Sequence, residues 1–319
     1  MTNEARVGDG SERGQRVGAL ARLFAAAPES WLPGVVELAR QGWSPEPGDG
    51  PALGLVRRSI GRLVRVDRAT LGAGLQALLV SEAVEVALRW LEVSGALGVL
   101  LPEVAEMVGF HHSSPRAHKD LWEHTLIVVG RVPAEPTLRW VALCHDIGKV
   151  ATRALVDGTL SFHRHEALGA WLFSGIAARL GMDEVQAKTI GFVIEHHART
   201  NAFEPSWSDR ALRRLIRECG SHLPAMLAFS RADWTTKQRH RQVAIAAQQV
   251  ELERRLAALM ALKVALPNGL SQALMAATGR EPGPWLGDAR RWIEVELEAG
   301  AEGGDAERWA LRWLGREQG

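Results

Sequence analysis

Helical periodicity runs through nearly the whole chain, and it constrains the fold more than any other feature. From Leu55 onward apolar residues recur at spacings of three and four, as in Leu75, Leu78 and Leu79, and this period places them on one face of a helix. Runs that alternate with β-branched residues, the sign of strands, are almost missing, and only a minor hairpin is expected around 156–159. The sequence therefore predicts an all-α fold, a core helical bundle flanked by smaller helical modules.

Glycine and proline divide this pattern into segments. Helices are expected at 17–27 and 32–41, a Pro/Gly-rich linker over 42–54, and a long helix at 234–262, because Gly and Pro favour turns. Two or three short helices are expected beyond residue 270. We therefore predict four parts: an N-terminal tail with short helices, a helical module, a larger helical domain and a C-terminal helical module, with bounds at 1–50, 51–116, 117–265 and 266–319.

The composition excludes several classes of protein. With 46% hydrophobic and 24% charged residues, the chain is typical of globular proteins. Its apolar runs fall far short of the roughly 20 residues that a membrane span needs, and its N-terminus lacks the apolar core of a signal peptide. We therefore expect a cytoplasmic protein without a membrane partner. A net charge of +1 gives no global electrostatic case for nucleic acid.

The few cysteines and the absent tyrosines narrow the chemistry further. Cys144 and Cys219 provide neither a disulfide framework nor a metal-binding Cys-x-x-Cys pair. The chain has no tyrosine, so a catalytic tyrosine is excluded. The oligomeric state is left open by the sequence.

Histidine and aspartate supply the most informative pattern. Most of the eleven histidines lie between His111 and His222. Imidazole and carboxylate together suit divalent ions such as zinc, manganese, iron or nickel, whereas a structural zinc site would be expected to include closely spaced cysteines. The pattern therefore favours a catalytic metal site with open positions for water and a phosphate oxygen.

Four residues are the main candidate ligands: His124, His145, Asp146 and Asp233. His124 precedes an apolar run and so lies on a helix face near the core. His145 and Asp146 end an apolar helix, and because adjacent helical residues diverge by about 100°, they are expected to straddle an ion. Asp233 is expected at the start of another helix, where burial without a cation would be costly. A buried salt-bridge cluster without a metal is the alternative.

At these residues the chain resembles the HD superfamily of metal-dependent phosphohydrolases. The order His, His-Asp, Asp is that family's pattern, and the run Ala142–Lys149, with the sequence ALCHDIGK, is very similar to its signature helix. The resemblance implies a divalent transition metal (Mn, Ni, Fe, Zn or Co) at the four candidate ligands. It also implies catalytic roles: Asp146 would bridge ions or take a proton from water, and Lys149 or Arg164 would offset charge on a phosphate. Pairing of Lys149 with Asp146 is an equal alternative.

The same resemblance implies a second ion. HD proteins with two or more metals add a histidine after the His-Asp pair and then a His-His pair, and His165, His196 and His197 occupy those places here. We therefore expect one or two metals per chain. The alternative is that these histidines lie at helix ends or on the surface. His118 is expected either to cap a helix or to contact substrate. The Gly-Tyr-Pro motif of one cyclic-dinucleotide-cleaving branch is missing, so that substrate is not implied.

A longer resemblance runs from about residue 53 to 314. Several segments are similar to the neck, body and tail of bacterial CCA-adding tRNA nucleotidyltransferases, namely Leu101–Val104, His118–Thr125, Phe162–Glu166, Gly283–Gly287 and Trp309–Leu314. The Gly-Gly-x-x-Arg-Asp and Asp-x-Asp motifs of the catalytic head are not found, so nucleotide addition is not expected. The resemblance implies hydrolysis of a nucleotide or RNA-end phosphate, with 2′,3′-cyclic phosphate or 2′-phosphate as the best guess and tRNA as a possible partner.

Two other functions compete with this hypothesis. The chain could be a non-catalytic tRNA- or RNA-binding scaffold whose His/Asp site is vestigial, or it could hydrolyse nucleoside triphosphates. Two arginine groups, Arg213-Arg214-Arg217 and Arg254-Arg255, are expected to be solvated faces or contacts to an RNA backbone. Metal analysis and a phosphatase and phosphodiesterase screen would separate the scaffold from the enzymes.

Overall fold

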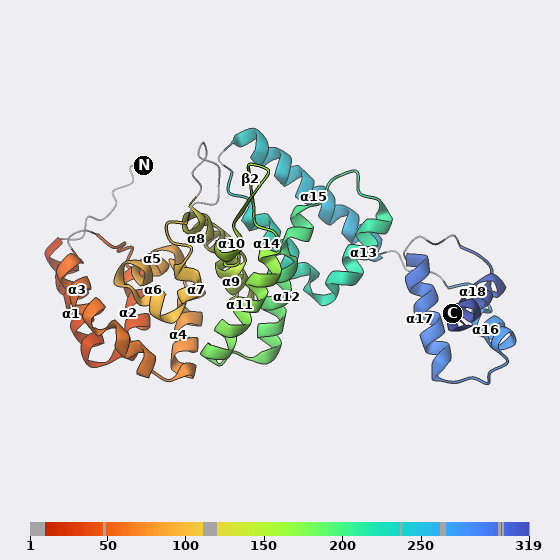
Figure 1. The fold of residues 1–319 in the computed structure, drawn as a ribbon, viewed down its shortest axis with the longest axis horizontal. Helices are drawn as coiled ribbons and strands as arrows, with labels where there is room; N and C mark the ends of the chain where they lie inside the picture. The colour runs from red at the N-terminus through yellow and green to blue at the C-terminus, as the bar shows by residue number, and fades with distance from the viewer. Residues whose placement is uncertain are drawn as a thin grey trace. The chain divides into compact units, whose positions relative to one another are not determined.

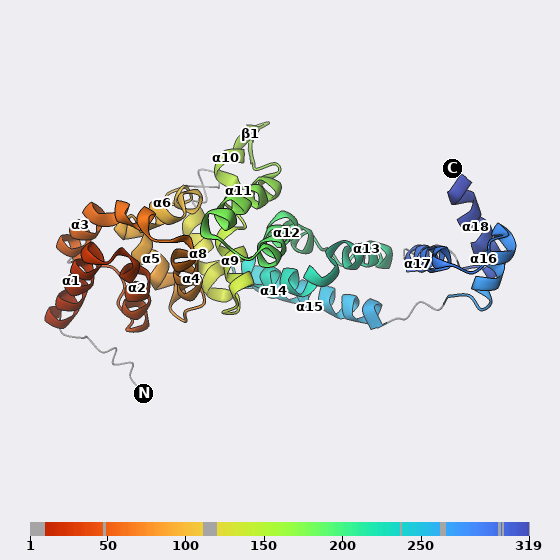
Figure 2. The same cartoon turned by 90° about the horizontal axis from the view of Figure 1, so that it is seen from below.

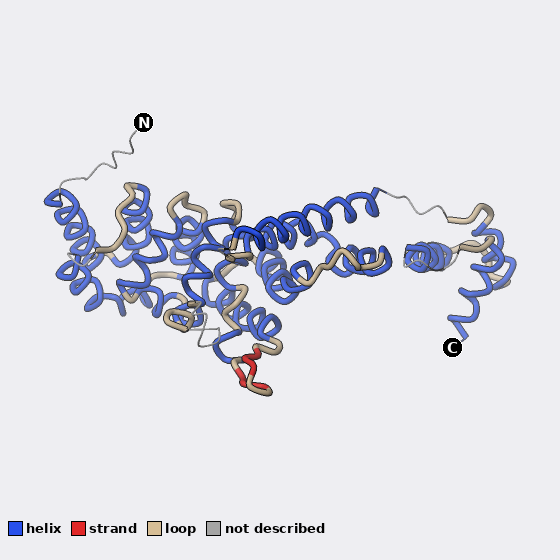
Figure 3. Tube along the Cα trace, turned by 90° about the horizontal axis from the view of Figure 1, so that it is seen from above, coloured by secondary structure: helices blue, strands red, loops and turns tan. Residues whose placement is uncertain are grey.

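A computed structural model describes residues 10–46, 49–110, 120–236, 238–261, 266–298, 301 and 303–318. Within these ranges the regular structure is helical apart from one two-stranded hairpin (Figure 3), which confirms the predicted all-α class. The chain divides into two compact units, one made of Met1–Ala202 with Pro224–Gln242 and the other of Phe203–Leu223 with Val243–Gly319. The four-part division stays a prediction.

The first unit carries most of the helices (Figure 1). Its elements are α1 (Gly10–Ala26), η1 (Pro28–Ser30), α2 (Trp31–Arg40), α3 (Gly50–Ser59), η3 (Ile60–Arg65), α4 (Arg68–Leu79), α5 (Val84–Ser94), α6 (Ala96–Leu100), α7 (Pro102–Ala105), α8 (Leu121–Arg131), α9 (Pro136–Cys144), α10 (Lys149–Thr152), β1 (Ala154–Val156), β2 (Thr159–Ser161), α11 (His165–Leu180), α12 (Glu184–Asn201) and α14 (Leu223–Asp233).

Helix α9 is the centre of this unit. Every residue from Leu138 to Cys144 is buried, and all of them except Arg139 are hydrophobic. A helix with so little polar surface belongs inside a core. It packs against α4, α8 and α12, and its Trp140 ring lies 6.2 Å from the ring of Phe173 in α11. Pro136 begins the helix, where a missing N–H leaves no bond unmade. The residues that directly follow Cys144, His145 and Asp146, therefore lie in the interior.

Side-chain caps fix the ends of the helices around α9. The Asp120 carboxylate accepts hydrogen bonds from the backbone N–H groups of Trp122 and Glu123 at 2.8 and 3.1 Å and so begins α8. Asp183 caps α12 in the same way through Gln186 at 2.9 Å. Such caps satisfy amide groups that have no partner within the helix, and they set where along each helix its functional residues fall.

The predicted hairpin is confirmed. Strands β1 and β2 pair antiparallel, with Leu155 opposite Leu160, and the turn between them uses Asp157 and Gly158 at φ of 49° and 74°. This pair of residues suits a tight turn with both backbones in the left-handed region. The hairpin lies between α10 and α11 in the chain (Figure 2).

The second unit holds α13 (Asp209–Cys219), η4 (Gly220–His222), most of α15 (Arg239–Ala261), α16 (Leu270–Thr278), α17 (Pro284–Glu298) and α18 (Ala306–Gln318). The last three helices enclose a core of their own that includes Leu274, Ile293 and Trp309. Three short helices beyond residue 270 agree with the sequence prediction. No helix within the described ranges combines the length and the apolar content that crossing a membrane requires.

Three sequence predictions about boundaries are wrong. Helix α1 begins at Gly10 rather than at residue 17. Helix α3 begins at Gly50, inside the predicted linker, because Pro51 stands in its first turn, where proline is tolerated rather than disruptive. The predicted helix from Trp234 begins only at Arg239. The reason is that residues between α14 and α15 are held by other contacts: the Trp234 carbonyl accepts a hydrogen bond from Arg131, and the Thr235 hydroxyl contacts His124.

The separate C-terminal core leads to a stability prediction. Leu274 is fully buried in it, whereas Leu311 of the same unit is 64% exposed. Leu274→Ala should cost about 2–5 kcal/mol through lost burial and a residual cavity, and Leu311→Ala should cost within about 0.5 kcal/mol. Hydrogen–deuterium exchange read by peptide should show lost protection over 270–313 in Leu274→Ala and unchanged protection over 121–144. Equal effects of the two substitutions would contradict this core.

Candidate metal centre

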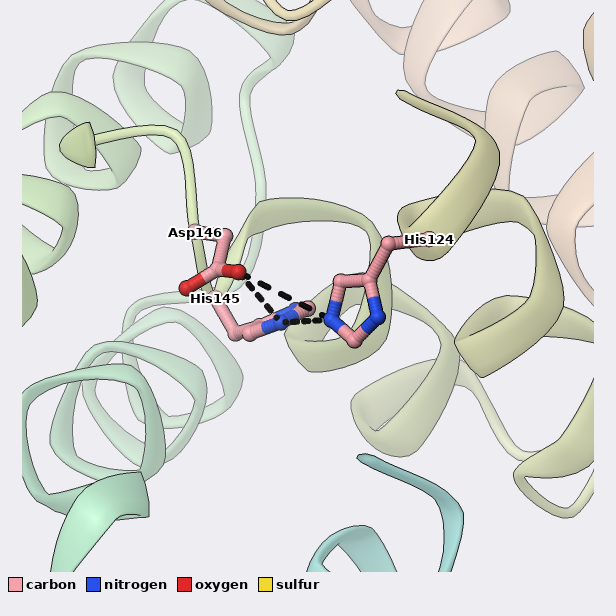
Figure 4. A group of neighbouring side chains, drawn as sticks. All are labelled: His124, His145 and Asp146. Carbon is pink, nitrogen blue, oxygen red and sulfur yellow. Dashed lines mark hydrogen bonds and ion pairs between the residues drawn. The ribbon is translucent and has the colours of Figure 1, made fainter. Parts of the chain in front are cut away.

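His145 and Asp146 follow α9 directly and lie in the interior. Both side chains are 1% exposed. The His145 Nε2 atom is 3.2 Å from Asp146 Oδ2, so the two residues converge on one point although they are adjacent in the chain. Figure 4 shows His124 reaching the same point from α8. The side chains of His145 and Asp146 therefore converge after α9 ends, and the ion between them stays a prediction.

His124 is held at both ring nitrogens. Its Nε2 atom lies 3.3 Å from His145 Nε2 and 3.7 Å from Asp146 Oδ2. Its Nδ1 atom lies 2.9 Å from the hydroxyl of Thr235. Arg131, two turns further along α8, donates to the carbonyl of Trp234. Helix α8 therefore fixes the segment after α14 at two places, and that segment in turn orients His124.

Asp233 joins the same group, but from a helix end that the sequence did not predict. It is the last residue of α14 rather than the start of a helix, which corrects the expectation. Its Oδ1 atom lies 3.3 Å from His124 Nε2 and 3.4 Å from His145 Nε2. Its Oδ2 atom accepts a hydrogen bond from Asn201 at 2.6 Å. The four main candidates are thus brought together.

A second group forms on the other side of Asp146. His165 begins α11 and His197 lies in α12. The His165 Nε2 atom is 3.5 Å from Asp146 Oδ1, and the His197 ring centroid lies 5.5 Å from that of His165 and 5.4 Å from that of His145. The two oxygens of Asp146 therefore face different groups of histidines.

Among the described residues, two sets of ligand atoms satisfy the spacing of a metal site. One set comes from His124, His145 and Asp146, and the other from Asp146, His165 and His197; within each set all the ligand atoms lie within 4.8 Å of one another. Asp146 is common to both sets.

The histidine tautomers suit metal binding. The Nδ1 atoms of His145, His165 and His197 lie 2.9, 2.9 and 2.7 Å from the backbone carbonyls of Ala142, Phe162 and Ile194. A carbonyl only accepts, so each Nδ1 carries a proton, and in the neutral form of each ring Nε2 keeps a lone pair. This outer contact is the one that metal-binding histidines usually make.

Two buried atoms of the cluster lack hydrogen-bond partners. Asp146 Oδ1 and His165 Nε2 are both buried, and neither makes a hydrogen bond to any residue in the described ranges. Unsatisfied buried polar atoms are rare because they cost free energy. An acceptor oxygen and an imidazole lone pair that face one another are what a cation between them would satisfy, so the residues present fit a metal ion.

The cluster also stabilises its two carboxylates in the charged form. Burial by itself raises the pKa of Asp146, but His145 and Lys149 outweigh burial and hold that pKa well below its usual range. Burial likewise raises the pKa of Asp233, while the hydrogen bond from His124 and the charge of His145 lower it to about 2. Both side chains are therefore anionic near neutral pH.

The pKa values of the histidines shift in opposite directions. Burial lowers the pKa of His145, yet the charges of Asp146 and Asp233 offset it and leave the pKa raised. Burial lowers the pKa of His165 and His197, and for His197 the charge of His145 adds to that effect. The second group therefore favours neutral imidazoles, which is the form that binds metals.

Lys149 is at the cluster and is already paired. Its Nζ atom lies 2.7 Å from Asp146 Oδ2 and 6.0 Å from the centroid of the Phe162 ring. Of the two roles considered from the sequence, the pairing with Asp146 is the one present here. The Lys149 side chain is 19% exposed, so it lies at the rim of the cluster, whereas Asp146 lies inside.

Two other predicted residues are not brought into the cluster. His196 stacks on Phe192, with centroids 4.3 Å apart and planes at 18°, and it contributes to neither ligand set within the described residues. Arg164 is exposed and occupies the left-handed region at φ 62° just before α11. His118 lies outside the described residues.

Sequence reasoning missed the polar residues that support the ligands. Asn201, Ser230 and Thr235 contact Asp233, Asn201 and His124 respectively. The one available signal was position: Asn201 follows His197 by four residues and so shares its helix face, and Thr235 follows Asp233 by two.

Gly148 lets two backbones meet at the cluster. A Cβ atom placed there would lie 2.1 Å from the His165 carbonyl oxygen and 2.8 Å from the Gly169 nitrogen. Any larger residue would push α11 away from the end of α9, and with it His165 from Asp146. The Ile147-Gly148-Lys149 run therefore has a packing role as well as a chemical one.

Comparison with known proteins relates this chain to tRNA nucleotidyltransferases. It is 30% identical over 256 residues to the A-adding tRNA nucleotidyltransferase of Deinococcus radiodurans, covering 75% of this chain and 57% of that protein. It is 32% identical over 268 residues to the CC-adding tRNA nucleotidyltransferase of Thermus thermophilus, covering 76% and 56%. A multifunctional CCA protein of Verminephrobacter eiseniae is 32% identical over 163 residues, covering 50% and 38%.

The relation covers part of each of these proteins. The chain spans a little over half the length of the two nucleotidyltransferases. No family model matches it. The matches therefore establish a relation to tRNA nucleotidyltransferases over about three quarters of this chain.

The different positions of His196 and His197 generate a prediction. In protein loaded with Mn²⁺, His197→Ala should lower the metal content by about one equivalent, because it removes a ligand of the second group. His196→Ala, its neighbour and matched control, should leave the content unchanged. Elemental analysis after exhaustive dialysis measures both. A loss in His196→Ala without one in His197→Ala would reverse the assignment.

Proposed function

We propose that this cluster binds divalent transition-metal ions and that the chain hydrolyses phosphate esters as an HD-type phosphohydrolase. The observation that carries the proposal is the position of the Asp146 carboxylate. One of its oxygens faces His145 and the other faces His165. A carboxylate shared between two groups of imidazoles is suited to hold two ions side by side.

The donor set supports the choice of metal. Imidazole nitrogens with carboxylate oxygens and no thiolate suit Mn, Fe, Co, Ni or Zn. The first ion would be held by His124, His145, Asp146 and Asp233, and the second by Asp146, His165 and His197. With one or both sites filled, three or four protein ligands per ion leave positions open for water and substrate, as in other catalytic sites.

The ion and the protein side chains would have different roles in the reaction. When bound, the ion lowers the pKa of water and polarises a phosphoryl oxygen. The histidines and Asp146 hold the geometry, and Lys149 at the rim offers a cation to a phosphate oxygen. In the net reaction a water oxygen forms a bond to phosphorus, one ester P–O bond breaks, and the released oxygen takes up a proton.

RNA ends are the substrate class that the relatives favour. The matching proteins are named for the addition of nucleotides to tRNA. Hydrolysis at the cluster requires a substrate whose phosphate can reach it. We therefore propose a nucleotide or RNA-end phosphate as substrate, with 2′,3′-cyclic phosphate or 2′-phosphate as the chemical form. An RNA-binding scaffold without catalysis is the competing function, and metal-dependent turnover separates the two.

Asp146→Asn tests the proposal directly. It removes the negative charge of the carboxylate that both ligand sets share and replaces one of its two oxygens by an NH₂ group, so metal content should fall to near zero. Hydrolysis of 2′,3′-cyclic AMP and bis-p-nitrophenyl phosphate should drop roughly 10²–10³-fold or more. Asp157→Asn is the matched control, because that aspartate is exposed in the hairpin turn and asparagine also tolerates a positive φ.

Full metal content in Asp146→Asn would show that the ligand set is wrong. Wild-type protein that binds metal but hydrolyses none of these esters, nor a nucleotide panel, would favour the scaffold.

The arginines of α13 supply a specific reason to expect RNA contacts. Arg210, Arg213 and Arg217 are spaced by three and four and share one helix face, and none of the three has an ion-pair partner in the described part of the chain. By contrast, Arg254 pairs with Glu251 at 2.7 Å and Arg255 with Asp209 at 2.5 Å. Of the first group singled out in the sequence, Arg214 is also paired, with Glu218 at 2.8 Å. Arg213 and Arg217, joined on their face by Arg210, are therefore the better candidates for phosphate contacts.

Paired substitutions can test this face. Arg213→Gln with Arg217→Gln should raise the KM for an RNA substrate more than the KM for a mononucleotide. The dependence of RNA binding on salt should also become shallower, by about 0.7 per phosphate contact on a log–log plot. Arg254→Gln is the control, since that charge is already neutralised by Glu251. Equal effects on both substrates would mean that the α13 face does not bind RNA and would make a small nucleotide the better substrate.

A further inference from the structure

We propose that Asn201 is a positioning residue that aims the carboxylate of Asp233 at the first metal. The proposal rests on the metal site proposed above. Asn201 Nδ2 donates to Asp233 Oδ2 at 2.6 Å, while Asp233 Oδ1 faces His124 and His145 at 3.3 and 3.4 Å. One oxygen is thereby tied back, and the other is presented to the ion.

The direction of this hydrogen bond is set by its neighbours. The Asp233 carboxylate is ionised and can only accept, so Asn201 must turn its NH₂ group toward it. The amide oxygen then faces the Ser230 hydroxyl, which donates to it at 2.6 Å. Ser230 is 2% exposed, so water does not compete for this contact. The chain of donors runs one way, from Ser230 through Asn201 to Asp233.

The same helix serves both ligand groups. Asn201 ends α12 and His197 lies four residues earlier, so the two side chains share a face. His197 belongs to the second ligand set, and Asn201 holds a ligand of the first. Helix α12 also contributes Ile190 and Ile194 to the core, both fully buried. A rigid, packed helix therefore sets Asp233 relative to the second site.

Without the amide, Asp233 would lose its alignment rather than its charge. The carboxylate is attached near the end of α14 by freely rotating bonds, and its Oδ2 would be left without that donor. Removing such outer hydrogen bonds from metal ligands typically weakens metal affinity by roughly 10–100-fold. The effect should fall on the site that contains Asp233, and the site containing His165 and His197 should be less affected.

The experiment measures Mn²⁺ binding to metal-free protein by isothermal titration calorimetry, together with the melting temperature of the metal-free form. Asn201→Ala and Asn201→Leu, of which the second keeps the branched shape of the side chain without its polar atoms, should each weaken one Mn²⁺ site by roughly 10–100-fold. The melting temperature tests for a merely structural role and should change little. Asn268→Ala, the same substitution at an exposed asparagine, is the matched control and should bind as wild type does.

Ser230→Ala gives a second, independent variant that leaves α12 intact. It should weaken the same site by a smaller factor, and it should have no further effect in the Asn201→Ala background, because Ser230 acts through the amide. Wild-type uptake that both Asn201 variants leave unchanged would overturn this inference alone. A wild-type protein that takes up no metal would overturn the proposed function and, with it, this inference. The two failures are therefore distinguishable.

Discussion

The centre of the structure depends on the contacts that compensate the buried charge of the Asp146 carboxylate. A charge at 1% exposure is tolerated only when cations and hydrogen bonds replace the lost water. Here His145, His165 and Lys149 surround it at 3.2, 3.5 and 2.7 Å. These residues come from the end of α9, from α10 and from α11. The charge of Asp146 is therefore compensated only when these elements pack together.

Local contacts hold the side chains of the cluster in place. In His145, His165 and His197 the Nδ1–H group donates a hydrogen bond to the backbone carbonyl three residues earlier. This local contact fixes the orientation of each ring. Gly148 allows the turn after α9 to touch the start of α11. Asn201 and Thr235 then fix Asp233 and His124 from outside. If the proposed function holds, the cluster is in place before an ion binds, and such preorganisation is how protein metal sites gain affinity.

Much of this arrangement could be predicted from sequence, and the rest failed for identifiable reasons. The run before His145, hydrophobic except for Arg139, identifies α9 and places His145 and Asp146 in the interior, because a helix with so little polar surface must be buried. Asp233 was assigned to the wrong end of a helix, since no glycine or proline marks the break before Arg239. His196 and His197 could not be distinguished, because neighbours on a helix differ only by a rotation of about 100°. Asn201 depends on a contact across 32 positions, which periodicity does not report.

Anomalous diffraction from crystals of Mn²⁺-loaded protein tests the central claim most directly. The account predicts a peak at the metal edge within about 2.0–2.3 Å of His124 Nε2 and His145 Nε2 and of the facing oxygens of Asp146 and Asp233. It also predicts a second peak beside His165 and His197, about 3.5–4 Å from the first. A cluster with no anomalous peak at saturating Mn²⁺, with Lys149 and the histidines alone compensating Asp146, would contradict it.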